Sequence, residues 1–151
     1  MEQTSSISNI IGESIQGAFE KLFSYQLEPL PFAETRISPD RYPYMASVNI
    51  HGENFSVHVY LLIPEDLLFT MASMILGDQL RNFDYQSVIK DQLGELLNVV
   101  GGTVKAALDI PASLGIPDVS ANVSETFHAL IQKSQQLSYI TGDQEILVLY
   151  H

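Results

Sequence analysis

The segment between positions 91 and 105 combines side-chain types and a spacing that could do chemistry. Glu95 and Asn98 lie three residues apart in a run of helical periodicity, and glycines stand at positions 94, 101 and 102. Residues three apart are neighbours on a helix surface, so the carboxylate and the amide would stand side by side. An amide accepts a hydrogen bond from water and also donates one, but it is not a general base at neutral pH. The pattern therefore favours the positioning of a water molecule over proton transfer.

The helical period divides this segment into two faces. At about 100° per residue, one apolar stripe holds Ile89, Leu93, Leu96, Val100, Val104 and Ala107. Within about 60° of the opposite direction lie Asp91, Gly94, Glu95, Asn98, Gly101, Gly102 and Lys105. Each glycine inside a helix costs roughly 0.8–1 kcal/mol relative to alanine. We infer that the three glycines provide clearance, so that a partner can approach the acid and the amide closely.

Two plainer interpretations stay open. The glycines could instead let another helix of the same molecule pack tightly, and the first helix offers Gly12 and Gly17 for such a contact. Asp91 and Lys105 either touch the rim of a partner or are ordinary solvated charges.

The stretch from Gly94 to Gly102, Gly-Glu-Leu-Leu-Asn-Val-Val-Gly-Gly, resembles the E-x-x-N helix of the CheC/CheX/FliY phosphatases of bacterial chemotaxis. In that family a glutamate, an asparagine and a downstream glycine hold these relative positions. Val99 departs from the many relatives that carry methionine there. The order and length of the other segments resemble the single-domain, CheX-like members, so the resemblance covers essentially the whole chain.

The resemblance implies a phosphatase that hydrolyses the aspartyl phosphate of a CheY-like response-regulator receiver domain. It implies that Glu95 docks the receiver by pairing with one of its lysines, and that Asn98 orients the attacking water. Because the receiver supplies Mg²⁺ and cationic groups around the phosphoryl oxygens, we expect no cofactor belonging to this chain.

The rival hypothesis is a non-catalytic CheX-like interaction module that binds a receiver or another signalling protein without hydrolysis. Relatives of this kind form homodimers through sheet edges. The strand that carries Leu147 and Leu149, or the one from Phe55 to Ile63, would offer such an edge.

A second, related motif lies in the first helix. CheC-like members carry the motif on both of their pseudo-symmetric helices, whereas CheX-like members carry one. The segment from Gly12 to Gly17 reads Gly-Glu-Ser-Ile-Gln-Gly, which is E-x-x-Q with Glu13 and Gln16. Glutamine has a longer reach than asparagine, and we interpret this pair as the vestige of a second site.

Apolar periodicity predicts the remaining elements. Period-two alternation predicts two hairpins, one from positions 45 to 63 and one from 138 to 150. Helical spacing predicts helices at about 5–24 and 85–109, and a shorter one from Pro64 to Gly77 that carries Leu67, Leu68, Met71, Met74 and Ile75, with Met71 and Met74 in the core. Prolines at 29, 31, 39 and 43 predict a loop or edge strand, and positions 119–127 predict a strand. Residues 128–136 are either a short helix or a connection.

These elements indicate one α+β domain over residues 1–151. Two long pseudo-symmetric helices would pack on an antiparallel sheet built from two hairpin-containing halves, as in CheX-like proteins. The length of the chain is that of a single domain, and nothing in the sequence indicates a linker.

Composition excludes several classes of function. The 151 residues carry 7 basic and 18 acidic side chains, a formal charge of −11, and the basic residues are dispersed singly. Nucleic acid and anionic membranes are therefore not expected as partners. The chain has no cysteine, and its four histidines show no metal-ligand spacing, so no metal site is predicted. The first residues do not resemble a signal peptide, and we expect a soluble cytoplasmic protein.

Overall fold

The computed structural model describes residues 2–30 and 38–151, with side chains from residue 7 onward in the first helix. In chain order the elements are α1 (Glu2–Phe23), β1 (Glu28–Pro29), the 3-10 turn η2 (Pro39–Arg41), β2 (Met45–Gly52), β3 (Phe55–Leu62), α2 (Glu65–Leu76), the 3-10 segment η3 (Gly77–Asn82), α3 (Tyr85–Leu108), β4 (Ser113–Leu114), β5 (Asp118–Ser120), α4 (Val123–Lys133), β6 (Gln135–Thr141) and β7 (Gln144–Tyr150). Pro31, which was predicted to lie in an extended segment, falls outside the described residues.

All strand pairs are antiparallel and belong to one seven-stranded sheet with the order β1-β6-β7-β3-β2-β4, in which β5 also pairs with β2. The two predicted hairpins, β2–β3 and β6–β7, are confirmed. Each has a two-residue turn, and Gly142 in the second turn adopts a φ of 60°, which glycine allows without steric cost. The hairpins join where β3 pairs with β7. The predicted α+β class with an antiparallel sheet is therefore confirmed.

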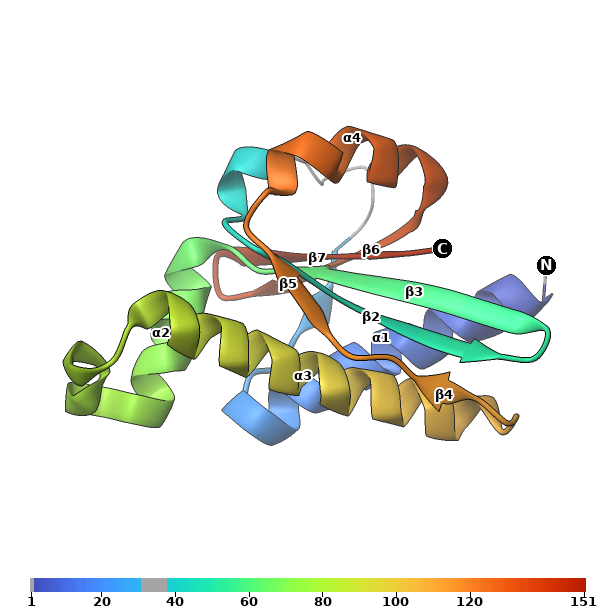
Figure 1. The fold of residues 1–151 in the computed structure, drawn as a ribbon, viewed down its shortest axis with the longest axis horizontal. Coiled ribbons are helices and arrows are strands. Elements are labelled where there is room, and N and C mark those ends of the chain that lie inside the picture. The colour runs from blue at the N-terminus through green and yellow to red at the C-terminus, as the bar shows by residue number, and fades with distance from the viewer. Residues whose placement is uncertain (1, 31–37) are drawn as a thin grey trace.

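The helices cover the sheet on both faces (Figure 1). α1 and α3 lie side by side on one face, where their apolar stripes and the facing strand residues form the main core. α2 packs at one end against α3. α4 covers the opposite face, over a second apolar cluster made of Tyr42, Met45, Leu62, Val123, Phe127, Leu130, Leu147 and Leu149.

The predicted strand at 119–127 is wrong beyond Ser120, because residues 123–133 form the helix α4. Val123, Phe127 and Leu130 are buried at a spacing of four and then three residues, which is the spacing of one helix face. The β-favouring side chains before Phe127 concealed this period. Of the two alternatives for residues 128–136, the structure has the helix, which continues to Lys133.

Two apolar residues of α2 are not where helical periodicity predicted them. Leu67, Leu68 and Met71 are buried as expected, whereas Met74 and Ile75 are more than half exposed. They lie in the last turn of α2 before Gly77 ends the helix with a positive φ. The apolar stripe of α2 is thus longer than the surface that covers it.

The strands that were predicted to offer an edge for dimerisation lie inside the sheet. β3 is paired with both β2 and β7, and β7 is paired with both β3 and β6. Leu147 and Leu149 are fully buried in the α4 cluster. The prediction of a dimer edge is wrong for β7 and for β3 from His58 to Leu62, since their backbone groups are paired within the chain. Residues 55–57 of β3 pair with β2 alone among the described strands.

Among the described residues, no helix has both the length and the hydropathy needed to cross a bilayer.

Candidate functional site on the outer face of α3

The helix α3 is held against the sheet by a continuous buried stripe. Its buried residues are Ile89, Leu93, Leu96, Leu97, Val100, Gly101 and Val104. Asp84 precedes the helix and accepts a hydrogen bond from the Ser87 hydroxyl at 2.8 Å, while Asp109 ends it in the left-handed conformation. Because this stripe fixes the rotation of the helix, Glu95 and Asn98 face away from the sheet and are exposed.

Glu95 and Asn98 line the same shallow hollow of about 620 Å³. The other lining residues are Lys90, Asp91, Gly94, Val99 and Pro117. Within the described part of the chain, neither the Glu95 carboxylate nor the Asn98 amide has a hydrogen-bond or ion-pair partner. The carboxylate is thus available to an incoming cation, and the amide is available to water.

The glycines of α3 divide into two kinds. A Cβ atom added at Gly94 or Gly102 would meet no atom within 4 Å, so both positions open toward solvent as predicted. A Cβ atom at Gly101 would lie 2.5 Å from Leu114 Cδ1 and 3.3 Å from Val48 Cγ1. The prediction that Gly101 faces a partner is therefore wrong. The buried stripe is wider than the helical wheel indicated, and Gly101 lets α3 approach β2 and β4 closely.

The alternative interpretation, tight packing between helices through glycines, is not supported by these contacts. Gly94, Gly102 and Gly17 all have open space at the Cβ position. Gly12 faces the sheet, where the Tyr139 hydroxyl lies 2.5 Å from the position of an added Cβ atom. The two glycines with close contacts, Gly12 on α1 and Gly101 on α3, thus pack against the sheet and not against another helix.

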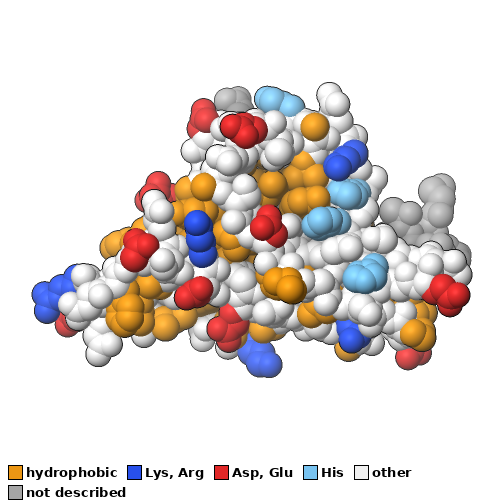
Figure 2. Space-filling model, in the orientation of Figure 1, with side chains coloured by type: hydrophobic (Ala, Val, Ile, Leu, Met, Phe, Trp, Pro, Cys, Tyr) orange, Lys and Arg blue, Asp and Glu red, His pale blue; other side chains and the backbone are white. Residues whose placement is uncertain are grey.

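The rim of the hollow contains residues that the sequence analysis found and others that it missed. Asp91 lines the hollow, whereas Lys105 is exposed but does not line it. Lys90 and Pro117 were missed, because one lies outside the polar face of the helical wheel and the other comes from the β4–β5 loop. Lysine and arginine side chains stand singly among acidic ones on the face shown in Figure 2, as their dispersed sequence positions predicted.

The Glu13–Gln16 motif of α1 does not present a free amide. Glu13 is exposed, but Gln16 is half-buried and its Nε2 donates a hydrogen bond to the Leu27 carbonyl oxygen at 3.0 Å. Gln16 thus fastens the chain after α1 to the helix.

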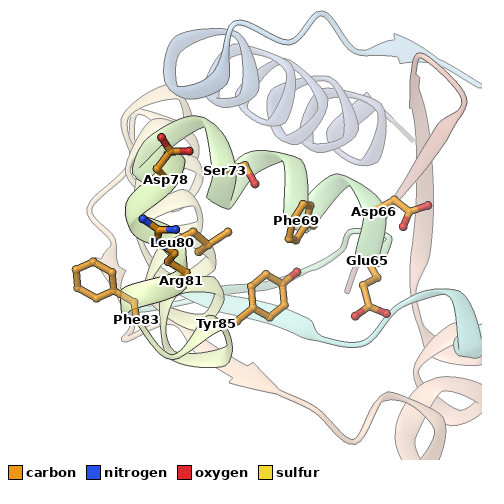
Figure 3. Close-up of a pocket in the computed structure, with 10 residues that line it drawn as sticks. Glu65, Asp66, Phe69, Ser73, Asp78, Leu80, Arg81, Phe83 and Tyr85 are labelled. Atoms are coloured by element: carbon orange, nitrogen blue, oxygen red, sulfur yellow. The ribbon is translucent and has the colours of Figure 1, made fainter.

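A second hollow, of about 690 Å³, lies between α2, η3 and the start of α3 (Figure 3). The rings of Phe69 and Tyr85 lie next to each other in it with centroids 6.0 Å apart, and Glu65, Asp66, Asp78 and Arg81 also line the hollow. Burial, with Glu65 nearby, raises the pKa of the Tyr85 phenol above its ordinary value. This hollow shares no lining residue with the Glu95–Asn98 hollow, so the two are separate surfaces.

The histidines do not form a metal site within the part of the chain that the structure describes. His58 does stack on Tyr60 with ring centroids 4.5 Å apart, and His151 lies next to both rings. Burial, together with the nearby Lys133, lowers the pKa of both histidines. The pairing of β3 with the chain end brings them together, which their sequence positions did not indicate.

The fold and this site define a class of protein: an α+β domain that carries an E-x-x-N pair on the exposed face of a long central helix. A model of the family described as chemotaxis phosphatase CheX matches residues 44–140, more than half of the chain. The chain therefore belongs to the CheX family. Glu95 and Asn98 lie inside the matched region, and Glu13 and Gln16 lie outside it.

Several solved structures share this fold. A CheX protein from Desulfovibrio desulfuricans is 17% identical with a TM-score of 0.73, covering 97% of this chain and 98% of that one. A CheX protein from Vibrio vulnificus is 14% identical with a TM-score of 0.70, covering 96% of each chain. CheX from Borrelia burgdorferi, in a complex with CheY, BeF3 and Mg²⁺, is 12% identical with a TM-score of 0.70, covering 94% of each chain. No curated protein matches this chain.

Proposed function

We propose that this chain is a phosphatase that hydrolyses the aspartyl phosphate of a CheY-like receiver domain. The observation that carries the proposal is the exposed, unpartnered pair Glu95 and Asn98 beside an open hollow on α3 of a CheX-family fold. The Borrelia burgdorferi relative of the same fold is seen in a complex with CheY, which supports a receiver as the partner.

Asn98 would orient the water that attacks the phosphorus atom. An acyl phosphate is already reactive, so what the reaction needs most is a water molecule held in line with the bond that breaks. The water oxygen forms the new bond to phosphorus, the bond to the aspartyl oxygen breaks, and the carboxylate leaves with the electron pair. A proton of the water passes to the phosphate that is released. The Asn98 amide changes no protonation state in this step.

Glu95 would fix the position of the receiver on α3. Glu95 precedes Asn98 by three residues, a rise of about 4.5 Å along the helix axis. An ion pair with a receiver lysine at this point would set where the phosphoryl group sits relative to the amide. Gly94 and Gly102 leave the neighbouring surface free, because a Cβ atom at either position would project into open space.

Decay of a phosphorylated receiver tests the proposal. A panel of CheY-type receivers, phosphorylated with acetyl phosphate and Mg²⁺ and freed of the donor, is mixed with wild-type protein or with Asn98→Ala. Wild-type protein is expected to accelerate the release of phosphate from at least one receiver, and the variant is expected to lose this effect. Binding of a receiver without any acceleration would contradict the phosphatase and support the non-catalytic module.

A further inference from the structure

Two exposed isoleucines lie next to residues of the Glu95–Asn98 site, one from α2 and one from the loop between β4 and β5. Ile75, in the last turn of α2, is 57% exposed, and Ile116, in the loop between β4 and β5, is 93% exposed. A single exposed apolar side chain is ordinary on a protein surface. Two of them next to one polar site call for an explanation, because apolar surface beside a site is typical of a protein contact.

On the Ile75 side, Glu95 forms one wall of a small hollow of about 90 Å³. Leu22 and Phe23 from the end of α1, together with Ile75, give this hollow an apolar lining. The amide of Gln92 also lines it, and both its nitrogen and its oxygen are buried without a hydrogen-bond partner among the described residues. Buried amides are almost always satisfied, so the unpaired amide of Gln92 is an unusual feature of this hollow.

On the Ile116 side, the loop is anchored to the sheet. The Gly115 N–H donates a hydrogen bond to the Asn49 carbonyl oxygen at 2.8 Å. The residue after Ile116, Pro117, lines the hollow that contains Glu95 and Asn98. The backbone is thus bonded to β2 on both sides of Ile116, through Gly115 before it and through β5 after it. Ile116 is therefore held at the surface next to the site.

We propose that Ile75 and Ile116 are the apolar contacts that hold a phosphorylated receiver over Glu95 and Asn98. This inference rests on the proposed function. An exposed ion pair at Glu95 gives register but little affinity, because water and salt screen it. Burial of apolar surface is the main source of affinity in protein complexes, and it must come from side chains next to the site. Ile75 lines a hollow together with Glu95, and Ile116 directly precedes Pro117, which lines the other hollow that contains Glu95. This proximity to the site points to the receiver as the occupant.

The test compares Ile75→Ser, Ile116→Ser and the double variant with a matched control, Ile110→Ser. Ile110 is also an exposed isoleucine, 43% exposed, but it follows α3 at its far end, and neither it nor its chain neighbours Asp109 and Pro111 line a hollow that contains Glu95. Steady-state dephosphorylation of a CheY-type receiver gives KM and kcat for each protein, and thermal unfolding confirms that each is folded. Because the exposed side chains contribute little to the core, all four variants are expected to fold.

We expect KM to rise about ten-fold for Ile116→Ser and several-fold for Ile75→Ser, with kcat changed less than about two-fold. Ile110→Ser is expected to match the wild type. An unchanged KM in the double variant would overturn the proposal, and so would a change in self-association, measured by light scattering, without a change in KM. The second result would assign the isoleucines to a contact between copies of this chain.

Binding separates the failure of this inference from the failure of the proposed function. The affinity for the receiver activated by BeF3 and Mg²⁺ is measured by calorimetry with the same proteins. If the wild type binds without hydrolysing, the proposed phosphatase fails while weaker binding by the isoleucine variants still supports the surface. If the wild type neither binds nor dephosphorylates any receiver, both proposals fail.

Discussion

The two long helices carry the same arrangement, a glutamate followed three residues later by an amide, and differ in what the amide does. On α1, Glu13 is exposed but the amide of Gln16 donates a hydrogen bond to the Leu27 carbonyl oxygen. On α3, Glu95 and Asn98 are both exposed, and neither side chain has a partner among the described residues.

The difference comes from the chain that follows each helix. After α1, Ser24 adopts a positive φ and the chain turns back, so that Leu27 is buried and its carbonyl lies within reach of Gln16. After α3, the chain leaves through Asp109 and runs along β2 as β4 and β5. Of the described residues after α3, only Pro117 lines the Glu95–Asn98 hollow. The same sequence pattern therefore gives an amide that is bonded within the chain on α1 and an amide that is available to a ligand on α3.

Replacement of the amides is the sharpest test of this contrast. Asn98→Ala is expected to lower kcat for receiver dephosphorylation roughly 100-fold, because the water loses its positioning group. Gln16→Ala is expected to leave kcat unchanged. Phosphate release under saturating receiver measures both. Equal losses in the two variants would show that α1 also carries a working site, and no loss in Asn98→Ala would remove the amide from the mechanism.

Neutralising each glutamate tests whether Glu95, and not Glu13, contributes to binding of the receiver. Glu95→Gln keeps the size of the side chain and removes its charge, so KM is expected to rise roughly two- to five-fold with a smaller change in kcat. The KM of the wild type is expected to increase with salt more steeply than that of the variant, since the ion pair is screened. Glu13→Gln is the control. If its KM rises as much as that of Glu95→Gln, α1 contributes to docking.

The glycines test how the two faces of α3 differ. Gly102→Ala adds a methyl group in open space and gains helix propensity, so the free energy of unfolding is expected to rise by about 0.5–1 kcal/mol. Gly101→Ala places the same group against Leu114 and Val48, and it is expected to be less stable than Gly102→Ala by at least about 1 kcal/mol. Urea unfolding followed by circular dichroism measures both. Equal stabilities would mean that α3 can move away from the sheet without cost.

Much of the fold followed from local periodicity. The alternation of Ala46, Val48 and Ile50 predicted β2 because a strand that is buried on one face repeats every two residues. α4 did not follow, because β-branched and aromatic side chains occur in both element types. Residues 123–133 form a helix because their apolar face packs into the second apolar cluster on the far face of the sheet.

The site was predictable in its centre and not at its edges. The proximity of Glu95 and Asn98 follows from their spacing on one helix, and this spacing can be read from the sequence. The buried position of Gly101 depends on how widely the sheet covers α3, and the exposure of Ile75 depends on where α1 ends. Pro117 reaches the hollow through the β4–β5 loop, 19 residues after Asn98 in the sequence. Such contacts are set by tertiary packing, which a helical wheel does not describe.

Replacement of Gln16 is also expected to have a small effect on stability. The bond from Gln16 Nε2 to the Leu27 carbonyl joins α1 to the segment that leads into β1. Loss of one such bond typically lowers the free energy of unfolding by about 1 kcal/mol. We therefore expect Gln16→Ala to lower this free energy by about that amount, whereas Asn98→Ala, at an exposed position without a partner, should change it by less than about 0.5 kcal/mol. The same unfolding measurement applied to both variants checks the difference. A larger loss of stability in Asn98→Ala would mean that its amide is used within the chain, and the contrast between the two helices would no longer hold.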